Sequence, residues 1–380
     1  MSERYPDFTS IGPDSLAGRF IRHFWQPVHL TENLPAGRIK PLRILGEDFT
    51  LFRGMGGAAH VVGPRCAHRG VSLAIGRVEG DCLRCFYHGW KYDGDGQCVE
   101  APAEREGFPS SAKIPSYPTR DYLGLVFAYL GEGEPPPFPR FTAIEQDGTV
   151  EAVERQRDWS YFNQLENSVD EVHFNFAHRR SKFTDVGLND EIPELDGRET
   201  EYGILRIGRR GDTERHSHIV MPNCMFSMTY DDHTGWIEHV AWRVPVEDHC
   251  HATFILNCLH KDGAAMEAYR HEKARRRELL KAMEPIESVV ERILRGELHA
   301  DDVANRPDII QVQDAVVLKS QGVRPDRDAD HLATSDRQVA LLRQIWTREL
   351  RAIEEGREIK DWRLPEGLAP TTGLGDQSSA

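Results

Sequence analysis

The sequence predicts an α+β fold made of two units. Short alternating apolar stretches separated by glycines dominate residues 38–130, and a proline-rich break follows at residues 131–139. Beyond the break, strand-like and helix-like stretches are mixed. The first unit is therefore expected to be a small antiparallel β domain. The second is expected to be a larger domain in which an antiparallel sheet wraps around helices.

The first unit is introduced by residues 15–30, SLAGRFIRHFWQPVHL, whose apolar spacing is helical and then extended. A short helix should therefore lead into the first strand. Further strands are expected in IKPLRILGEDFTLFRG, AAHVVGP and LGLVFAYLGEGEP, and Asp-Gly-Asp-Gly at residues 93–96 predicts a hairpin turn. Because GEGEPPPFP at residues 131–139 cannot continue a strand, we assign residues 26–135 to the first domain.

The second unit is assigned to residues 143–365, with residues 1–25 packing on it. It opens with the strand-like GTVEAVERQRDW, followed by SYFNQLENSVDEVHFNFAHRR, whose lack of Gly and Pro predicts a helix. Residues 200–260 return to strands. Further helices are expected over residues 264–296, 307–321 and 335–355. The tail, residues 366–380, is polar and is expected to be disordered.

Composition excludes several classes of function. The chain carries 47 basic and 61 acidic residues, a net charge of -14, which disfavours binding to nucleic acids or anionic membranes. No apolar run reaches the roughly 20 residues of a membrane span, and the first residues do not look like a signal peptide. Seven cysteines, an odd number, indicate the reducing cytoplasm and no disulfides.

Two short motifs combine soft metal ligands with glycines. Cys66 and His68 form a CxH pair, and Cys85 and His88 form a CxxH pair. A glycine follows each pair closely, which lets the backbone turn sharply and direct both side chains of a loop to one point. Four such ligands in two loops predict a metal centre.

Two metal centres fit this ligand set. One is a structural zinc site, and the other is a Rieske [2Fe-2S] cluster, in which two cysteines bind one iron and two histidines bind the other. Zinc fingers usually group cysteines with cysteines, whereas each loop here supplies one Cys and one His. This division favours the Rieske cluster over zinc, and over a third interpretation in which the four residues simply pack in the core.

A second constellation lies in the predicted helix of the second unit. Asn167, Asp170 and His173 are spaced three apart, so they are expected to share one face of that helix. His178 lies five residues beyond His173. Both imidazoles can reach one ion only if the helix ends or bulges between them, and such distortions are common at functional sites.

Two histidines and one carboxylate form the facial triad of non-haem Fe(II) oxygenases, which leaves positions open for dioxygen and substrate. We expect the carboxylate to be Asp314. In a helix that starts at Pro307, it shares a face with Ile310 and Val317, and a charge on a buried face needs a partner such as a metal. The alternative is that Asp314 pairs with a buried arginine.

Together the two motifs resemble those of a known family. The stretches CAHRG and CFYHGW are similar to the cluster-binding motif of Rieske non-haem iron oxygenases, and the two histidines of the second motif follow roughly 85 residues later, as in the α subunits of ring-hydroxylating oxygenases. The phrases FWQPVHL, GEDFTLFRG and FYHGWKYD look closest to the branch of phthalate dioxygenase, carbazole dioxygenase and 5,5'-dehydrodivanillate O-demethylase.

The resemblance implies a terminal oxygenase with a helix-grip-like catalytic domain, one Rieske cluster and one mononuclear Fe(II). It implies that Asp170 bridges the two centres between neighbouring subunits of a head-to-tail homotrimer, and that Asn167 lies near the iron. O2 and an aromatic acid or aryl ether would be the substrates, for ring hydroxylation or O-demethylation. Since the chain has no GxGxxG dinucleotide signature, an NAD(P)H-dependent reductase or a ferredoxin would supply electrons.

Three other functions are kept as alternatives. One is cis-dihydroxylation of a different aromatic or heteroaromatic compound, because the same iron can perform it. A second is a zinc-stabilised binding protein without catalysis. The third is a simple electron carrier, which would leave the second unit without a role.

The walls of the substrate pocket are harder to assign. Candidates on the predicted strands are Met221, Phe226, Trp236 and Trp242, although such residues on strands usually belong to the core. A carboxylate substrate would need a cation at the end of the pocket, but the sequence does not distinguish Arg206, Arg209 or Arg210 from surface charge.

Overall fold

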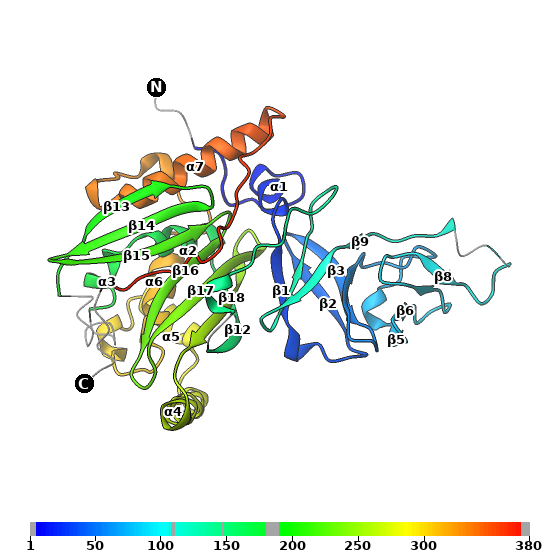
Figure 1. Cartoon of the computed structure of the whole chain (residues 1–380), viewed down its shortest axis with the longest axis horizontal. Helices are drawn as coiled ribbons and strands as arrows, with labels where there is room; N and C mark the ends of the chain where they lie inside the picture. Colours follow the sequence, from blue (N-terminus) through cyan, green and yellow to red (C-terminus); the bar gives the residue numbers. More distant parts are fainter. Residues whose placement is uncertain (1–4, 106, 108–110, 146–147, 180–189, 374–380) are drawn as a thin grey trace.

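The computed structural model describes residues 5–105, 107, 111–145, 148–179 and 190–373. Figure 1 shows two lobes: a smaller lobe of strands on the right, and on the left a larger lobe in which helices surround a long sheet. The α+β fold predicted from the sequence is thus confirmed.

The smaller lobe contains three antiparallel sheets. A three-stranded sheet has the order β1-β11-β10, and two four-stranded sheets have the orders β2-β3-β4-β9 and β5-β6-β7-β8. The strands are β1 (Gln26–Leu30), β2 (Ile39–Ile44), β3 (Glu47–Arg53), β4 (Ala59–Val62), β5 (Arg77–Glu79), β6 (Cys82–Arg84), β7 (Lys91–Tyr92), β8 (Cys98–Glu100), β9 (Ser116–Tyr117), β10 (Thr119–Tyr122) and β11 (Leu125–Ala128). The turn predicted at residues 93–96 joins β7 to β8, as expected.

The larger lobe is built on one seven-stranded antiparallel sheet with the order β12-β18-β17-β16-β15-β14-β13. Its strands are β12 (Thr149–Arg157), β13 (Glu194–Glu199), β14 (Gly203–Arg210), β15 (Thr213–Val220), β16 (Cys224–Asp231), β17 (Gly235–Glu247) and β18 (Cys250–Leu259). Successive strands from β13 to β18 are neighbours, so the sheet is a meander, and β12 returns to pair with β18.

Seven α-helices surround this framework in the described part of the chain. They are α1 (Leu16–Arg22), α2 (Tyr161–Val169), α3 (His173–Phe176), α4 (Gly263–Ala282), α5 (Ile286–Leu294), α6 (Ile309–Ser320) and α7 (Arg337–Glu354). Short 3-10 turns lie at η1 (Thr31–Asn33), η2 (Leu73–Ile75), η4 (Thr142–Ile144), η5 (Ala300–Val303), η6 (Arg327–Ala329) and η7 (Thr334–Asp336).

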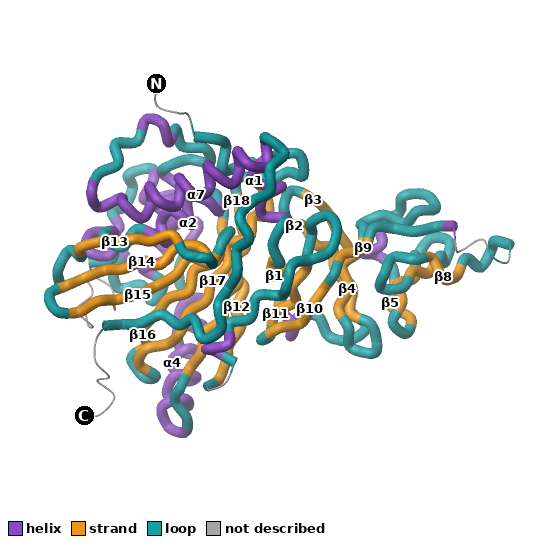
Figure 2. Tube along the Cα trace, turned by 45° about the horizontal axis from the view of Figure 1, so that its top comes forward, coloured by secondary structure: helices purple, strands orange, loops and turns teal. Residues whose placement is uncertain are grey.

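The helices hold α2 against the sheet. α2 packs on β17 and also contacts α6 and α7, while α7 packs on β13 and on α1. Figure 2 shows α1, α2 and α7 in purple above the orange strands of the sheet. The core at this junction is aromatic: Phe162 of α2 lies 5.0 Å from the ring of Trp346 of α7 and 4.5 Å from the ring of Phe8. The chain N-terminal to α1 therefore helps to fix the position of α2.

One hydrophobic core extends across both lobes, and the smaller lobe has a second core of its own around Leu83 and Trp90. Phe127 of β11 and Trp242 of β17 meet edge to face, with ring centroids 5.4 Å apart, and Asn223 donates a hydrogen bond of 2.9 Å to Gln26. These contacts are buried. The two lobes are therefore packed against each other through buried side chains.

Several predicted elements are confirmed and others need correction. The helices expected at residues 307–321 and 335–355 are α6 and α7. The single helix expected over residues 264–296 is instead two helices, α4 and α5, because the ring of Pro285 and its missing N–H break the continuity.

Part of the C-terminal tail, residues 366–373, lies within the described chain. Within the tail expected to be disordered, Thr371 exchanges backbone hydrogen bonds of 3.0 and 3.1 Å with His216 of β15, so the segment as far as residue 373 lies on the sheet. Residues 374–380 lie outside the described chain.

In the part that the structure describes, none of the helices combines the length and the apolar character needed to cross a membrane.

Candidate metal centres and the adjoining cavity

The two cysteine–histidine loops have the same local geometry. The N–H of Cys66 donates to the carbonyl of Val71 over 2.9 Å, and the N–H of Cys85 donates to the carbonyl of Trp90 over 2.8 Å, so each loop closes across five residues. The glycine four residues after each cysteine has a positive φ of 69° or 74°, a conformation that glycine adopts without strain. Two copies of one turn therefore face each other at the end of the lobe.

The four predicted ligands converge between these turns. Cys66 and Cys85 are buried. Burial is the main cause that raises the pKa of the Cys85 thiol, and contact with Cys66 raises it further. The rings of His68 and His88 lie with centroids 4.5 Å apart, and Nδ1 of His68 is buried without a hydrogen-bond partner. An orphaned ring nitrogen beside two adjacent buried thiols is a donor set that a cationic group would satisfy, so the residues fit a [2Fe-2S] cluster.

The surroundings of the loops are asymmetric. Trp90 stacks on His68 at 4.7 Å, and the hydroxyl of Tyr92 lies 3.1 Å from Sγ of Cys66. Both cysteines are buried, whereas the two histidines are half-exposed and are flanked by Phe86 and Tyr87, which are 69% and 55% exposed. Any partner that approaches the loops meets the histidines first.

In the larger lobe, the helix that was expected to carry the second constellation ends early. α2 stops at Val169, and Asp170 has the extended angles φ -82° and ψ 123°, so Asn167, Asp170 and His173 do not share one helical face as predicted. Asp170 Oδ1 accepts from the N–H groups of Val172 (2.9 Å) and His173 (3.4 Å), which holds the chain in a turn. A new short helix, α3, then starts at His173 and ends at Phe176.

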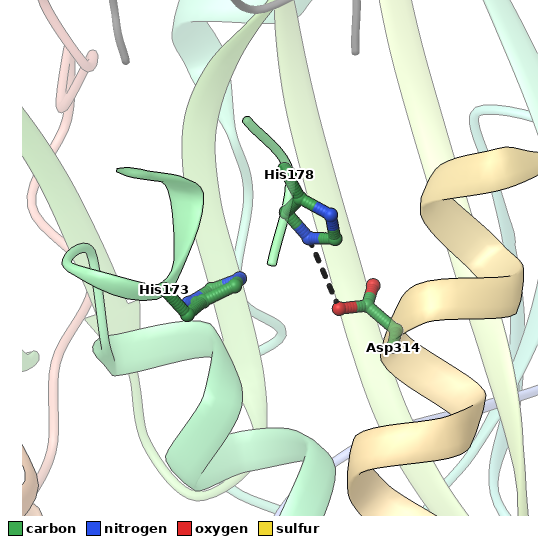
Figure 3. Close-up of side chains that lie close together, drawn as sticks. All are labelled: His173, His178 and Asp314. Carbon is green, nitrogen blue, oxygen red and sulfur yellow. Dashed lines mark ion pairs between the residues drawn. The ribbon is translucent and has the colours of Figure 1, made fainter. Parts of the chain in front are cut away.

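This turn brings three of the predicted ligands together, because α3 ends before His178. Nε2 of His178 lies 3.2 Å from Oδ1 of Asp314, which belongs to α6, and the rings of His173 and His178 have centroids 5.0 Å apart. Donor atoms of all three residues lie within 4.8 Å of one another, and Figure 3 shows the side chains pointing toward a common point. Nδ1 of His173 is buried without a hydrogen-bond partner and lies on the side of Asp170, which leaves Nε2 as the ring nitrogen for a metal.

The protonation states suit a cation at this point. Burial lowers the pKa of His173, so its ring is neutral at pH 7 and can donate a lone pair. Burial acts to raise the pKa of Asp314, but hydrogen bonding to His178 and the nearby imidazoles bring it below its ordinary value. Burial acts to lower the pKa of His178, but hydrogen bonding to Asp314 raises it above its ordinary value, so a metal would have to displace the proton that these two residues share. Two imidazoles and one carboxylate are the ligands of a 2-His-1-carboxylate iron site.

Two amides orient the triad. Oε1 of Gln313 lies 2.8 Å from Nδ1 of His178 and can accept its proton there, while Nε2 of His178 lies 3.2 Å from Oδ1 of Asp314, so a metal bound at Nε2 would take the place of that contact. Asn167 donates from Nδ2 to Oδ1 of Asp314 over 3.2 Å. Oδ2 of Asp170 lies 3.8 Å from Nδ1 of His173, too far for a hydrogen bond, and its side chain is 35% exposed.

Asp314 was chosen from the sequence on reasoning that the structure corrects in part. It does not lie on the main apolar stripe of α6, which consists of Ile309, Val312, Ala315 and Leu318, and Val317 is 40% exposed. Asp314 instead lies on the side of α6 that faces α2 and His178. A helix that packs against two neighbouring elements buries parts of two faces. The apolar stripe in its sequence marks only one of these faces.

A cavity of about 160 Å³ adjoins the triad. His173, His178 and Asp314 line it together with three buried arginines of the sheet: Arg206, Arg215 and Arg243. The other lining residues are Gln164, Asn167, Ser168, Asp170, Phe174, Met225, Ser227, Met228, Thr229, His239 and Ile310. The wall that faces the triad is therefore unusually cationic for a buried surface.

The predicted pocket walls lie elsewhere. Met221 and Trp242 line a separate cavity of about 310 Å³ on the other face of the sheet, Phe226 is in the core, and Trp236 packs on Tyr230. The signal that could have found the cavity residues is strand alternation, since His239 and Arg243 lie on the same face of β17 and Trp242 lies on the opposite face.

The arginines divide by their partners. Arg206 and Arg215 lie 4.0 and 3.9 Å from the buried carboxylate of Glu171, and Arg210 forms a 2.7 Å ion pair with it. Arg209, the remaining arginine considered from the sequence, pairs with Glu214 at 2.6 Å. Arg206, which the sequence could not distinguish from surface charge, is buried beside the cavity.

Arg243 differs from these arginines. Within the described residues it has no carboxylate partner, and Nη2 makes one long contact of 3.3 Å with Oγ of Ser168. Its Nε and Nη1 are buried without acceptors. Burial lowers its pKa to about 10, so the guanidinium still carries its charge at neutral pH.

Comparisons with known proteins agree with this geometry. Residues 24–118 match the Rieske [2Fe-2S] domain family. The chain is 26% identical over 378 residues to the 5,5'-dehydrodivanillate O-demethylase oxygenase subunit of Sphingobium sp., covering 94% of this chain and 82% of that protein. It is 28% identical over 379 residues to the phenoxybenzoate dioxygenase subunit alpha of Ectopseudomonas oleovorans, covering 92% and 86%.

Solved structures show the same fold. The terminal oxygenase of carbazole 1,9a-dioxygenase from Novosphingobium sp. KA1 superposes with a TM-score of 0.65 at 20% identity, over 91% of this chain and 97% of that chain. An oxygenase–ferredoxin complex of carbazole 1,9a-dioxygenase gives a TM-score of 0.64 at 18% identity, over 90% and 95%. The chain thus carries a Rieske [2Fe-2S] domain and is homologous over most of its length to oxygenase subunits, which disfavours the zinc alternative at the two loops.

Proposed function

We propose that this chain, a Rieske-type oxygenase subunit, is the terminal oxygenase of a multicomponent system and oxygenates an aromatic carboxylate with O2. Cys66, His68, Cys85 and His88 would hold the [2Fe-2S] cluster, and His173, His178 and Asp314 would hold one Fe(II). The matching turns of the two loops and the convergence of the triad support these two ligand sets. We take the domains to be residues 26–135 and 143–365.

The observation that carries the substrate class is Arg243. A buried cation without a counter-ion costs free energy, and folded proteins keep such a group only where a partner or a function compensates for it. Arg243 lines the cavity beside the triad and has donors to spare. A substrate carboxylate would supply the missing negative charge and would place the attached ring in the cavity toward the iron ligands.

The residues around the iron site have separate tasks. Arg243 would bind and orient the substrate, while Gln313 keeps the proton of His178 on Nδ1, away from the metal. When bound, the iron supplies the activation of O2. Asn167 restrains the carboxylate of Asp314, and the buried walls of the cavity limit the access of water to the reacting ring.

Electrons would arrive singly from a ferredoxin or an NAD(P)H-dependent reductase at the exposed histidine side of the cluster loops. The cluster loops and the triad lie in different lobes, so transfer is proposed to occur between subunits of a head-to-tail homotrimer in the cytoplasm. Asp170, whose carboxylate is partly exposed beside His173, would bridge the two centres across that interface. The exposed aromatic pair Phe86 and Tyr87 supports a contact of the loops with another protein surface.

Metal analysis tests the two centres. Anaerobically purified protein should contain about three irons and two acid-labile sulfides per chain, the sum of one [2Fe-2S] cluster and one iron. A His173→Ala variant should lose one iron and keep the cluster absorption. Protein that holds zinc without sulfide would overturn the proposal.

Matched substrates test the carboxylate. O2 uptake and product formation should be measured for a substituted benzoate and for the corresponding benzamide, which has nearly the same shape without the charge. We expect turnover of the acid and at least tenfold lower kcat/KM for the amide. Equal rates would reject an anionic substrate while leaving the oxygenase function in place.

Two reaction outcomes are compatible with this site, and product analysis separates them. A methoxybenzoate that undergoes O-demethylation releases formaldehyde and a phenol, whereas ring dihydroxylation gives a cis-diol and no formaldehyde. The similarity to both an O-demethylase and a dioxygenase subunit makes both assays necessary.

A further inference from the structure

A second cluster of metal-ligating side chains lies away from the iron triad. Glu238 of β17, Cys258 of β18 and His260, just after β18, have donor atoms within 4.8 Å of one another. In the described residues, only this group and the triad of His173, His178 and Asp314 bring three or more such donors so close. We propose that Glu238, Cys258 and His260 form a second metal site that binds a zinc-class divalent cation.

Sheet register explains why these three residues converge. Glu238 and Cys258 are direct cross-strand partners in the antiparallel pair β17–β18, so their side chains project from the same face. His260 lies two residues beyond Cys258 and so falls on that face as well. Nε2 of His260 is 2.5 Å from Oε2 of Glu238, so the imidazole and the carboxylate already meet.

The site is independent of the catalytic iron. Even-numbered residues of β17, such as Glu238 and Trp242, project to one face of the sheet, whereas His239 and Arg243 line the catalytic cavity on the other. A metal at Glu238 would therefore be separated from the iron by the sheet itself. Its occupation does not depend on substrate or on the cluster.

The donor set favours zinc over iron or magnesium. A thiolate, an imidazole and a carboxylate are the three zinc ligand types, with bonds of roughly 2.0–2.3 Å, and hard cations avoid the thiolate. Tetrahedral zinc with these three ligands keeps a fourth position, which would open to solvent beside His260, whose side chain is 37% exposed. Binding would replace the His260–Glu238 hydrogen bond with two metal bonds and release the thiol proton of Cys258 to solvent.

The local packing suits a fixed site. Cys258 is fully buried, and the carboxylate of Glu238 is 18% exposed, so two of the three ligands are restrained by the sheet before any metal binds. Only His260 lies beyond the end of β18 and has to adjust. A metal here would join the ends of β17 and β18 where the sheet meets the 3-10 turn η4, whose Ile144 carbonyl lies 4.0 Å from Sγ of Cys258.

Cobalt titration of the iron-loaded holoprotein tests the proposal, because Co2+ reports on thiolate coordination. Difference spectra against the untreated protein remove the absorption of the cluster. We expect one equivalent of Co2+ to produce a thiolate charge-transfer band and tetrahedral d–d bands, and Zn2+ to displace it. Cobalt at the catalytic triad would give no thiolate band, since that triad contains no cysteine.

Variants identify the ligands. Cys258→Ser should abolish the thiolate band, and His260→Ala, a change at a partly exposed position that leaves the core intact, should weaken cobalt binding at least tenfold. Cys250→Ser, at the opposite end of β18, is the matched control and should behave as wild type. Absence of the thiolate band in wild type, or a band that persists in Cys258→Ser, would overturn the proposal. Iron content and oxygenase activity should be unchanged in His260→Ala, so this result is separate from the fate of the proposed function.

Discussion

Replacement of Arg243 tests the substrate site most directly. Arg243 is 5% exposed, and its guanidinium has no carboxylate partner among the described residues and makes a single 3.3 Å contact with Ser168. We consider two changes: Arg243→Lys, which keeps the charge but loses the planar fork, and Arg243→Met, which keeps the apolar stem and removes the charge.

The expected loss follows from the bond that the substrate would make. A hydrogen bond to a charged group contributes about 1.5–3 kcal/mol, and each 1.4 kcal/mol is a factor of ten, so Arg243→Met should lower kcat/KM for an aromatic acid by about 10- to 150-fold. Arg243→Lys should fall between this variant and wild type. For the benzamide analogue the same substitutions should change kcat/KM by less than about threefold, because no ion pair is lost.

The thermal stability of Arg243→Met should not fall with its activity. Burial lowers the pKa of Arg243 to about 10, which means that the folded state pays for keeping the cation out of water. Replacing an unpaired buried charge by an apolar side chain of similar length is often neutral or stabilising. The melting temperature of Arg243→Met should therefore equal or exceed that of wild type, which excludes unfolding as the cause of lost activity.

The assay is O2 uptake with product quantification at saturating electron donor, for the acid and the amide in parallel. Arg209→Met, which removes a half-exposed arginine that pairs with Glu214, is the matched control and should leave both rates unchanged. If Arg243→Met lowered the rates for acid and amide equally, Arg243 would act on the structure of the cavity and not on the carboxylate.

Three further predictions concern the bridge, the cluster and acid stability. Asp170→Asn should leave the iron and sulfide content unchanged but lower the single-turnover yield of product per oxidised cluster; an unchanged yield would contradict a bridging role. Tyr92→Phe removes a hydroxyl 3.1 Å from Sγ of Cys66, and because a donor to the thiolate stabilises the reduced cluster, the reduction potential measured by voltammetry should fall. Burial lowers the pKa of His251 from 6.5 to about 3 in the folded state. Below pH 6.5 the unfolded chain therefore binds a proton that the folded chain does not. As the pH falls from 8 to 5, this residue alone should lower the free energy of unfolding by about 2 kcal/mol. Urea unfolding of His251→Gln should show a flatter pH dependence than wild type, whereas His271→Gln, an exposed control, should not.

The sequence was most informative where a motif and a turn coincide. The cysteine–histidine loops could be predicted because ligand type, spacing and glycine position all constrain the same few residues. The proximity of His173 and His178 could also be anticipated from their spacing, whereas Asp314 was chosen from a helical face that the structure corrects in part. The early end of α2 could not, because it depends on the side chain of Asp170 accepting two backbone N–H groups, a local bond that competes with the helix and leaves no apolar signature.

The buried arginines that line the cavity could not be predicted from the sequence, for a different reason. Arginines in strands look alike in sequence whether they pair at the surface, as Arg209 does, or lie buried, as Arg206 does. What separates them is the partner, and Glu171, which gathers Arg206, Arg210 and Arg215, lies on the turn after α2, far from the strands in sequence. Burial of a charge is therefore decided by tertiary contacts that no local pattern encodes.

Strand β17 shows how one element can serve two sites. Most of its residues are apolar or aromatic on both faces, because the sheet is covered by helices on one side and by the smaller lobe on the other. Polar side chains on such a strand are exceptions that need a compensating partner. Arg243 on the cavity face and Glu238 on the opposite face are two of these exceptions: the first has no carboxylate partner in the part of the chain that the structure describes, and the second has an imidazole and a thiol as neighbours. An anionic substrate on one face and a divalent cation on the other would compensate the two charges separately. Arg243→Met should therefore leave cobalt binding unchanged, and His260→Ala should leave the turnover of the aromatic acid unchanged.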